Sequence, residues 1–149
     1  MINKEGIDLI KSHEGLSLKA YPDPATGGEP YTIGFGSTYY EDGTKVKLGD
    51  HVTEERATKL FETIAEKFAV KVKALITSNV NSNQLSALVS FSYNVGVNAL
   101  KSSTLLKKVN ANPNDPTIKA EFMKWIKANG KVMNGLKKRR EAESNLYFK

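Results

Sequence analysis

The sequence predicts an α+β fold, in which a small strand-rich region follows a short first helix and further helices make up the rest of the 149 residues. Residues 16–36 combine an alternating segment with a Pro- and Gly-rich turn, as in a hairpin. Residues 53–75 carry apolar side chains at intervals of three and four, which predicts a long amphipathic helix. We therefore expect a single domain over residues 1–149, with a β-lobe over about 15–50 and a helical lobe over about 53–149 plus the N-terminal helix.

The first helix is expected to begin after Asn3, a good N-cap residue, and to end at Glu14, because Gly15 suits the position after a helix. Glu14 continues the apolar face of this helix, so we expect it to face the interior. Burial and the negative end of the helix dipole both favour the protonated form of a carboxyl group there, which a general acid requires. An arginine partner would oppose this effect, and Arg139 and Arg140 are available for that role.

Two further polar residues stand out downstream of Glu14. Asp23 lies nine residues on, between two prolines, and Thr32 a further nine on, in a strand-like segment that also holds Gly34 and Gly36. Each has an ordinary interpretation when taken alone, as a solvated helix end, a turn residue and a strand threonine. Taken together, they form a candidate hydrolytic site with two carboxylates.

The remaining elements follow from turn and capping signals. Asp42-Gly43 predicts a hairpin turn, and the nearby Tyr39 and Tyr40 are either sugar-stacking residues or plain strand aromatics. Thr53 is expected to cap the long helix. The later helices are expected over about 83–93, from Ser102 or Ser103 through Val109, from about Pro116 through Trp125 and Ile126, and over about 136–147, with a loop over 130–135.

Composition excludes several function classes. The chain has no cysteine, which rules out disulfides and thiol catalysis, and its two histidines are isolated, so we expect neither a metal site nor a cofactor. The net charge of +6 favours anionic partners. The lysines are nevertheless spread along the chain, as on solvated helix faces, and no recognition module accompanies them. We therefore expect no nucleic-acid partner.

The spacing of the candidate site residues is similar to that of a known family. Glu14 at a helix end, Asp23 nine residues later and the segment Thr32-Ile33-Gly34-Phe35-Gly36 together resemble the signature of the phage-type lysozymes, the endolysin muramidases of glycoside hydrolase family 24. The commoner spacing from Asp to Thr in that signature is six, whereas here it is nine, with a longer Gly-Gly-Glu-Pro turn. Ser37 stands where many members carry His.

The resemblance covers the whole chain. The segment 87–96 is similar to the central-helix motif of the family, 102–106 follows it in the expected place, and 130–136 with 139–143 resembles the closing segment. The resemblance implies a lysozyme-like fold, with a small N-terminal β-lobe, a larger helical lobe and an active-site cleft between them.

The resemblance also implies the reaction, which is hydrolysis of the β-1,4 bond between N-acetylmuramic acid and N-acetylglucosamine in bacterial peptidoglycan. Glu14 would protonate the leaving oxygen. Asp23 would stabilise the positive charge on the sugar ring or act as base on water, and Thr32 would position that water. We expect inversion, because a threonine that holds water is useful only if water attacks the sugar directly.

The expected partner is the glycan strand of peptidoglycan, and the expected role is host lysis for phage release. The first ten residues show no signal-peptide pattern, and no segment is long and apolar enough for stable membrane insertion. We therefore expect accumulation in the host cytoplasm, export through a separate holin pore, and action in the periplasm or cell wall. A monomer is expected.

Three alternatives remain open at the level of sequence. A lytic transglycosylase would cleave the same bond and needs mainly the glutamate. A non-catalytic wall-binding module would keep the fold without the reaction. Both are disfavoured by the joint presence of Glu14, Asp23 and Thr32. The third alternative is a basic nucleic-acid-binding domain, for which salt-dependent binding of short duplexes would be the test.

Overall fold

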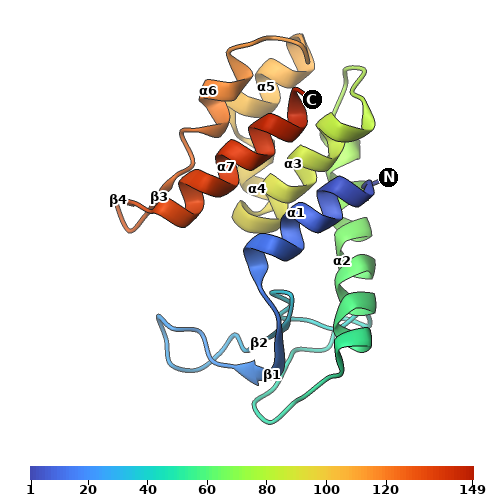
Figure 1. Ribbon diagram of the computed structural model, residues 1–149, viewed down its shortest axis with the longest axis vertical. Coiled ribbons are helices and arrows are strands. Elements are labelled where there is room, and N and C mark those ends of the chain that lie inside the picture. Colours follow the sequence, from blue (N-terminus) through green and yellow to red (C-terminus); the bar gives the residue numbers. More distant parts are fainter. The chain divides into compact units, whose positions relative to one another are not determined.

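The computed structural model describes all residues from 1 to 149 and has an α+β architecture of mostly helices with two small antiparallel sheets (Figure 1). Two compact units can be distinguished. We call Glu14–Ala65 the β-unit, and Met1–His13 together with Glu66–Lys149 the helical unit. The elements in chain order are α1 (Lys4–Glu14), β1 (Ser17–Tyr21), β2 (Thr32–Gly34), α2 (Glu54–Leu75), α3 (Ser82–Val95), α4 (Val97–Lys101), α5 (Thr104–Ala111), α6 (Ile118–Phe122), β3 (Lys127–Ala128), β4 (Lys131–Val132) and α7 (Asn134–Tyr147).

Helix α1 begins and ends where the sequence predicts. The side chain of Asn3 accepts a hydrogen bond from the Gly6 N–H at 2.9 Å, which satisfies one of the free donors of the first turn. After Glu14 the chain turns through Gly15, whose φ of +71° is a left-handed conformation that favours glycine. The Asn3 amide also donates to the side chain of Asn83 at 2.7 Å, which ties the start of α1 to α3.

The β-unit is built on the antiparallel pair β1 and β2. Ile33 in β2 is fully buried and packs with Val46 and Leu60 in a small apolar core. Leu60 comes from α2, whose first turn is capped by Thr53, since the Arg56 N–H donates to the Thr53 hydroxyl oxygen at 3.1 Å. The predicted cap and the predicted core face of α2 are therefore both confirmed.

The predicted hairpin at Asp42-Gly43 is also present. Tyr39 pairs with Lys45 across it, and the Tyr40 N–H donates to the Thr44 carbonyl at 2.9 Å.

Helix α3 is the centre of the helical unit. Its residues from Gln84 to Ser92 are all buried, as expected for a helix surrounded by others. A capping box fixes its start, because Asn81 accepts from the Gln84 N–H and the Gln84 side chain accepts from the Asn81 N–H. Helix α3 packs most extensively against α7, beside which it lies in Figure 1.

Helix α7 contributes three buried charges to this contact. Arg139, Arg140 and Glu143 are at most 3% exposed, and the Arg140 Nε lies 3.0 Å from a Glu143 carboxylate oxygen. The other Glu143 oxygen accepts from the Ser90 hydroxyl at 2.6 Å. The Arg139 guanidinium in turn donates to the Ser90 carbonyl at 3.2 Å. The cluster therefore joins α7 to α3 through hydrogen bonds as well as charge.

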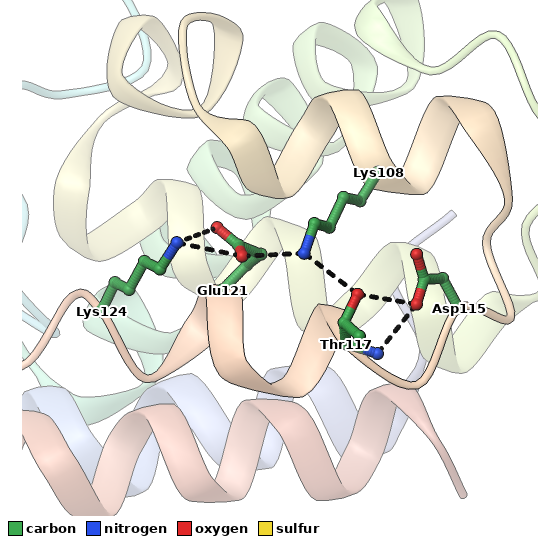
Figure 2. A network of polar contacts seen from close by, with 5 residues as sticks. All are labelled: Lys108, Asp115, Thr117, Glu121 and Lys124. Carbon is green, nitrogen blue, oxygen red and sulfur yellow. Dashed lines mark hydrogen bonds and ion pairs between the residues drawn. The ribbon is translucent and has the colours of Figure 1, made fainter.

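A second polar cluster links α5 to the region around α6 (Figure 2). The carboxylate of Glu121 is almost completely covered, and the ammonium groups of Lys108 and Lys124 approach it at 3.0 and 2.9 Å. Lys108 also donates to Thr117, whose hydroxyl donates to the carboxylate of Asp115. Hydrogen bonds from Lys124 and Lys108 hold the pKa of the Glu121 carboxyl below its usual value.

The structure corrects the sequence predictions in the C-terminal third. The helix expected to run to Ile126 ends at Phe122, and Trp125 lies beyond it, half-buried and packed edge-on against Phe91 at 5.3 Å. The loop expected over 130–135 includes strand β4, which pairs with β3 in a short hairpin. Asn129 and Gly130 form its turn, both with positive φ, as an Asn-Gly hairpin requires. Helix α4 was not predicted.

None of the helices is both long and apolar enough to span a bilayer. Helix α2 has the length, but charged side chains are distributed along it.

Candidate active site

The three predicted site residues all belong to the β-unit, and the strand register relates them to one another. In the β1–β2 pair, Tyr21 lies opposite Thr32 and Ser17 lies opposite Gly34. Asp23 follows Tyr21 by two residues, so it leaves β1 at the end where Thr32 begins β2. Glu14 precedes Ser17 by three residues and enters β1 at the other end. The hairpin thus places the two carboxylates at the two ends of one strand pair.

The Glu14 carboxylate lies directly over the backbone of Gly36. A Cβ atom at residue 36 would sit 3.0 Å from Glu14 Oε2 and 3.3 Å from its carboxyl carbon. Gly36 also has a φ of +88°, which disfavours any other residue. Residue 36 is therefore a point of close approach to the backbone. The group that approaches is the carboxylate of the predicted acid.

The geometry around Gly36 is set by a tight turn after β2. The Ile33 N–H donates to the Ser37 carbonyl at 2.8 Å, and the Ser37 N–H donates back to Ile33 at 2.9 Å. Phe35, at the tip of this turn, packs against Phe61 of α2 with ring centroids 5.6 Å apart. The turn is thereby anchored to the core, and Gly36 is held in place beneath Glu14.

Glu14 is half-buried, so the expectation that it faces the interior is met in part. Its helical face does carry the buried Ile10 one turn earlier. The helix ends at Glu14, and the following Gly15 and Leu16 are exposed.

Asp23 is held by its own turn. Its Oδ1 atom accepts from the Ala25 N–H at 2.7 Å, its N–H donates to the Gly28 carbonyl at 3.0 Å, and its carbonyl accepts from Gly27 at 2.8 Å. These contacts fix the backbone of Asp23 and engage one carboxylate oxygen. The side chain is half-buried, as is that of Thr32.

The two tyrosines after β2 behave differently from each other. Tyr40 is half-buried, and its hydroxyl donates to Asp50 at 2.7 Å. Burial, together with this hydrogen bond, raises the pKa of Tyr40 to about 12. Tyr40 is therefore part of the framework. Tyr39 is 48% exposed and remains available for a ligand.

The structure shows that Arg139 and Arg140 have an acidic partner the sequence analysis missed, Glu143, which lies three and four residues further along α7. At that spacing the pair looks like an ordinary surface ion pair, and the helix has too few apolar residues to indicate that this face is buried. Metal-ligating side chains do not gather in groups of three or more anywhere in the chain.

Comparison with known proteins agrees with this architecture. The family model described as phage lysozyme matches residues 11–143. An endolysin of Bacillus phage B103 is 47% identical over 147 residues, which cover 99% of this chain but 54% of that endolysin. The chain therefore spans about half the length of this curated relative.

Solved structures extend the comparison. An endolysin from Escherichia coli O157:H7 phage FAHEc1 superposes with a TM-score of 0.86 at 37% identity, covering 99% of this chain and 92% of that one. The muramidase domain of SpmX from Asticaccaulis excentricus gives 0.85 at 30% identity, covering 100% and 98%. The fold is thus that of the lysozymes, and the chain belongs to the phage lysozyme family.

Proposed function

We propose that this chain is an endolysin that hydrolyses the β-1,4 bond between N-acetylmuramic acid and N-acetylglucosamine in peptidoglycan and so lyses the host wall for phage release. Membership of the phage lysozyme family supports the reaction, and one structural neighbour is a muramidase domain by name. The observation that carries the proposal is the β1–β2 register, which relates Glu14, Asp23 and Thr32 on one hairpin with the Glu14 carboxylate over Gly36.

In this mechanism Glu14 is the general acid. Cleavage of a glycosidic bond needs a proton on the leaving oxygen, and a carboxyl group at the open end of a helix can deliver it to a bound glycan. The close backbone at Gly36 limits where this carboxyl can lie, so the proton is delivered from a defined position.

In this mechanism Asp23 and Thr32 act on the face of the sugar opposite to Glu14. Asp23 stabilises the oxocarbenium-like ring or takes the proton of the attacking water, and Thr32 orients that water. The turn that fixes Asp23 engages its Oδ1 with the Ala25 N–H. Direct attack by water inverts the anomeric centre.

The test of this proposal is the release of reducing ends from purified peptidoglycan by wild type and by Glu14→Gln. Loss of the general acid should lower the rate by about 10²–10⁴-fold. The exposed Glu62→Gln serves as the matched control and should keep full activity, with all three proteins showing the same thermal unfolding. Full activity in Glu14→Gln would overturn the assignment.

Inversion is tested separately. The anomeric proton of the newly formed reducing end is followed by NMR within the first turnovers, before mutarotation. An α product at early times supports direct attack by water, whereas a β product would require a covalent intermediate on Asp23 and would remove the proposed role of Thr32.

We further propose that residues 1–149 act as one catalytic domain and as a monomer, that the chain accumulates in the host cytoplasm, and that it reaches the wall through a holin pore. The names of its endolysin relatives support action on the host wall. Expression in a bacterial host should cause lysis only when a pore-forming protein is added. Sedimentation should give a single species near 16.4 kDa.

A further inference from the structure

The β-unit contains a cavity that the proposed reaction does not use. Its volume is about 220 Å³, and it lies between the turn that ends in Glu29-Pro30 and the hairpin that carries Tyr39 and Lys45. Tyr31 also lines it. Because side chains alternate along a strand and Tyr31 packs with the buried Ile33, the cavity lies on the face of β2 opposite to Thr32. It is therefore separate from the candidate catalytic groups.

One wall of the cavity comes from the part of the sequence that departs from the commoner family signature. The longer Gly-Gly-Glu-Pro turn increases the spacing from Asp23 to Thr32 to nine residues. Hydrogen bonds hold this turn in shape, since the Thr26 hydroxyl donates to the Glu29 carbonyl at 2.8 Å and accepts from the Gly28 N–H at 3.2 Å. Glu29 thus belongs to an ordered wall.

The lining combines an apolar floor with two opposite charges. Val46 forms a buried floor, and the rings of Tyr31 and Tyr39 provide aromatic surface. Lys45 lies beside Tyr39 because the two residues pair across the hairpin. Neither the Lys45 ammonium nor the Glu29 carboxylate forms an ion pair within the protein. The cavity therefore offers one cation and one anion to a ligand with apolar parts.

We propose that this cavity binds the peptide stem of peptidoglycan, with Lys45 pairing a free carboxylate of the stem and Glu29 pairing its free side-chain amine. The substrate class rests on the proposed function, since a wall-degrading enzyme meets stem peptides wherever it meets muramic acid. The charge pattern favours the peptide over the glycan, because the sugar ring of N-acetylglucosamine carries neither charge. Tyr39 covers the aliphatic part of the stem.

The first experiment measures binding without catalysis. A free stem tetrapeptide with an unmodified side-chain amine is titrated into labelled wild-type protein and followed by NMR. Signals of Tyr31, Tyr39 and Val46 should shift. Dissociation constants should rise about ten-fold in Lys45→Ala and in Glu29→Gln, which corresponds to about 1.4 kcal/mol. Acetylation of the side-chain amine alone should weaken binding of the peptide to wild type. It should not weaken binding to Glu29→Gln any further.

The matched control is Lys47→Ala, an exposed lysine of the same segment that does not line the cavity and should bind as wild type does. Unchanged dissociation constants in both cavity variants would overturn the proposal. It would equally be overturned if uncharged chitotetraose shifted the cavity signals more strongly than the peptide, since that result would identify a sugar site.

The second experiment links the cavity to the reaction. The ratio of kcat/KM on intact peptidoglycan to that on glycan stripped of its peptides should fall about ten-fold in Lys45→Ala and stay constant in Lys47→Ala. An equal ratio in the two variants would contradict a stem site. If wild type cleaves neither substrate, the proposed function fails, and the peptide titration still decides the cavity by itself.

Discussion

At the scale of single residues, the candidate site combines a glycine with its two carboxylates. Gly36 leaves the space that the Glu14 carboxylate occupies, and its positive φ is compatible with few other residues. The chain contains a natural control at Gly43, which has the same φ of +88° but nothing within 4 Å of its missing Cβ. Substitutions at these two positions therefore separate the effect of backbone strain from the effect of displacing the Glu14 carboxylate.

We predict that Gly36→Ala and Gly43→Ala each cost about 1–2 kcal/mol of stability, since both put a Cβ on a left-handed backbone. Only Gly36→Ala should also lose activity, by about 10²-fold, because its methyl group would displace the Glu14 carboxylate. Urea unfolding and wall turnover measure the two effects. Equal activity in both variants would show that the position of Glu14 over Gly36 has no role in catalysis.

Asp23 permits a similar separation of structure from charge. Asn at residue 23 keeps an oxygen that can accept from the Ala25 N–H, whereas Ala removes both the charge and the turn acceptor. We predict that Asp23→Asn retains the stability of wild type but loses about 10²-fold or more in activity. Asp23→Ala should lose activity and also unfold more readily. Activity retained in Asp23→Asn would contradict a role for the carboxylate charge.

At the scale of elements, the cluster around Glu121 attaches α5 to α6 through a covered carboxylate with two lysine partners (Figure 2). The lowered pKa of Glu121 means that the folded protein binds this proton less readily than the unfolded chain. The contribution to stability is therefore present above the ordinary glutamate pKa of 4.5 and is lost as pH falls below it.

We predict that Glu121→Gln costs about 1–2 kcal/mol at pH 7, because both lysines keep part of their hydration. The difference from wild type should shrink as the pH approaches 3. The exposed pair of Glu5 and Lys149 provides the comparison, and Glu5→Gln should change stability by less than about 0.5 kcal/mol. A penalty for Glu121→Gln that stays constant with pH would contradict this account.

Some of the helices and strands could be predicted from the sequence and others could not. The ends of α1 were predictable because Asn3 and Gly15 are local signals. The hairpin of β3 and β4 was missed although Asn129-Gly130 is a strong turn signal, because strands of two residues are too short to show alternation. The pairing of Tyr21 with Thr32 could not be predicted either. Tyr21 is exposed, so an alternation of buried apolar residues does not fix the register of β1.

At the scale of the whole molecule, the basic character of the chain is partly internal. Arg139 and Arg140 stand within a cationic run in the sequence, yet both are buried and form ion pairs with the same buried carboxylate, that of Glu143. Their side chains are therefore not part of the exposed basic surface. The sequence shows where these arginines lie along the chain. Their burial could not be predicted from it, because burial follows from how α7 packs on α3.

We predict that Glu143→Gln destabilises the protein by about 3–5 kcal/mol, because it removes the carboxylate that pairs with the fully buried Arg140 guanidinium. That is a large fraction of the stability of a typical domain. The neighbouring Glu141 is exposed, and Glu141→Gln should stay within about 0.5 kcal/mol of wild type. Denaturant unfolding of both variants measures the difference, and a similar midpoint for the two would show that the buried cluster contributes little.

Mass spectrometry of the ends released from purified peptidoglycan decides whether Glu14 acts as the acid of a hydrolysing muramidase. We predict reducing muramic acid ends from wild type and none from Glu14→Gln. Anhydro-muramic ends from wild type would contradict this prediction, since they would show an intramolecular reaction that needs no water and leaves no task for Thr32.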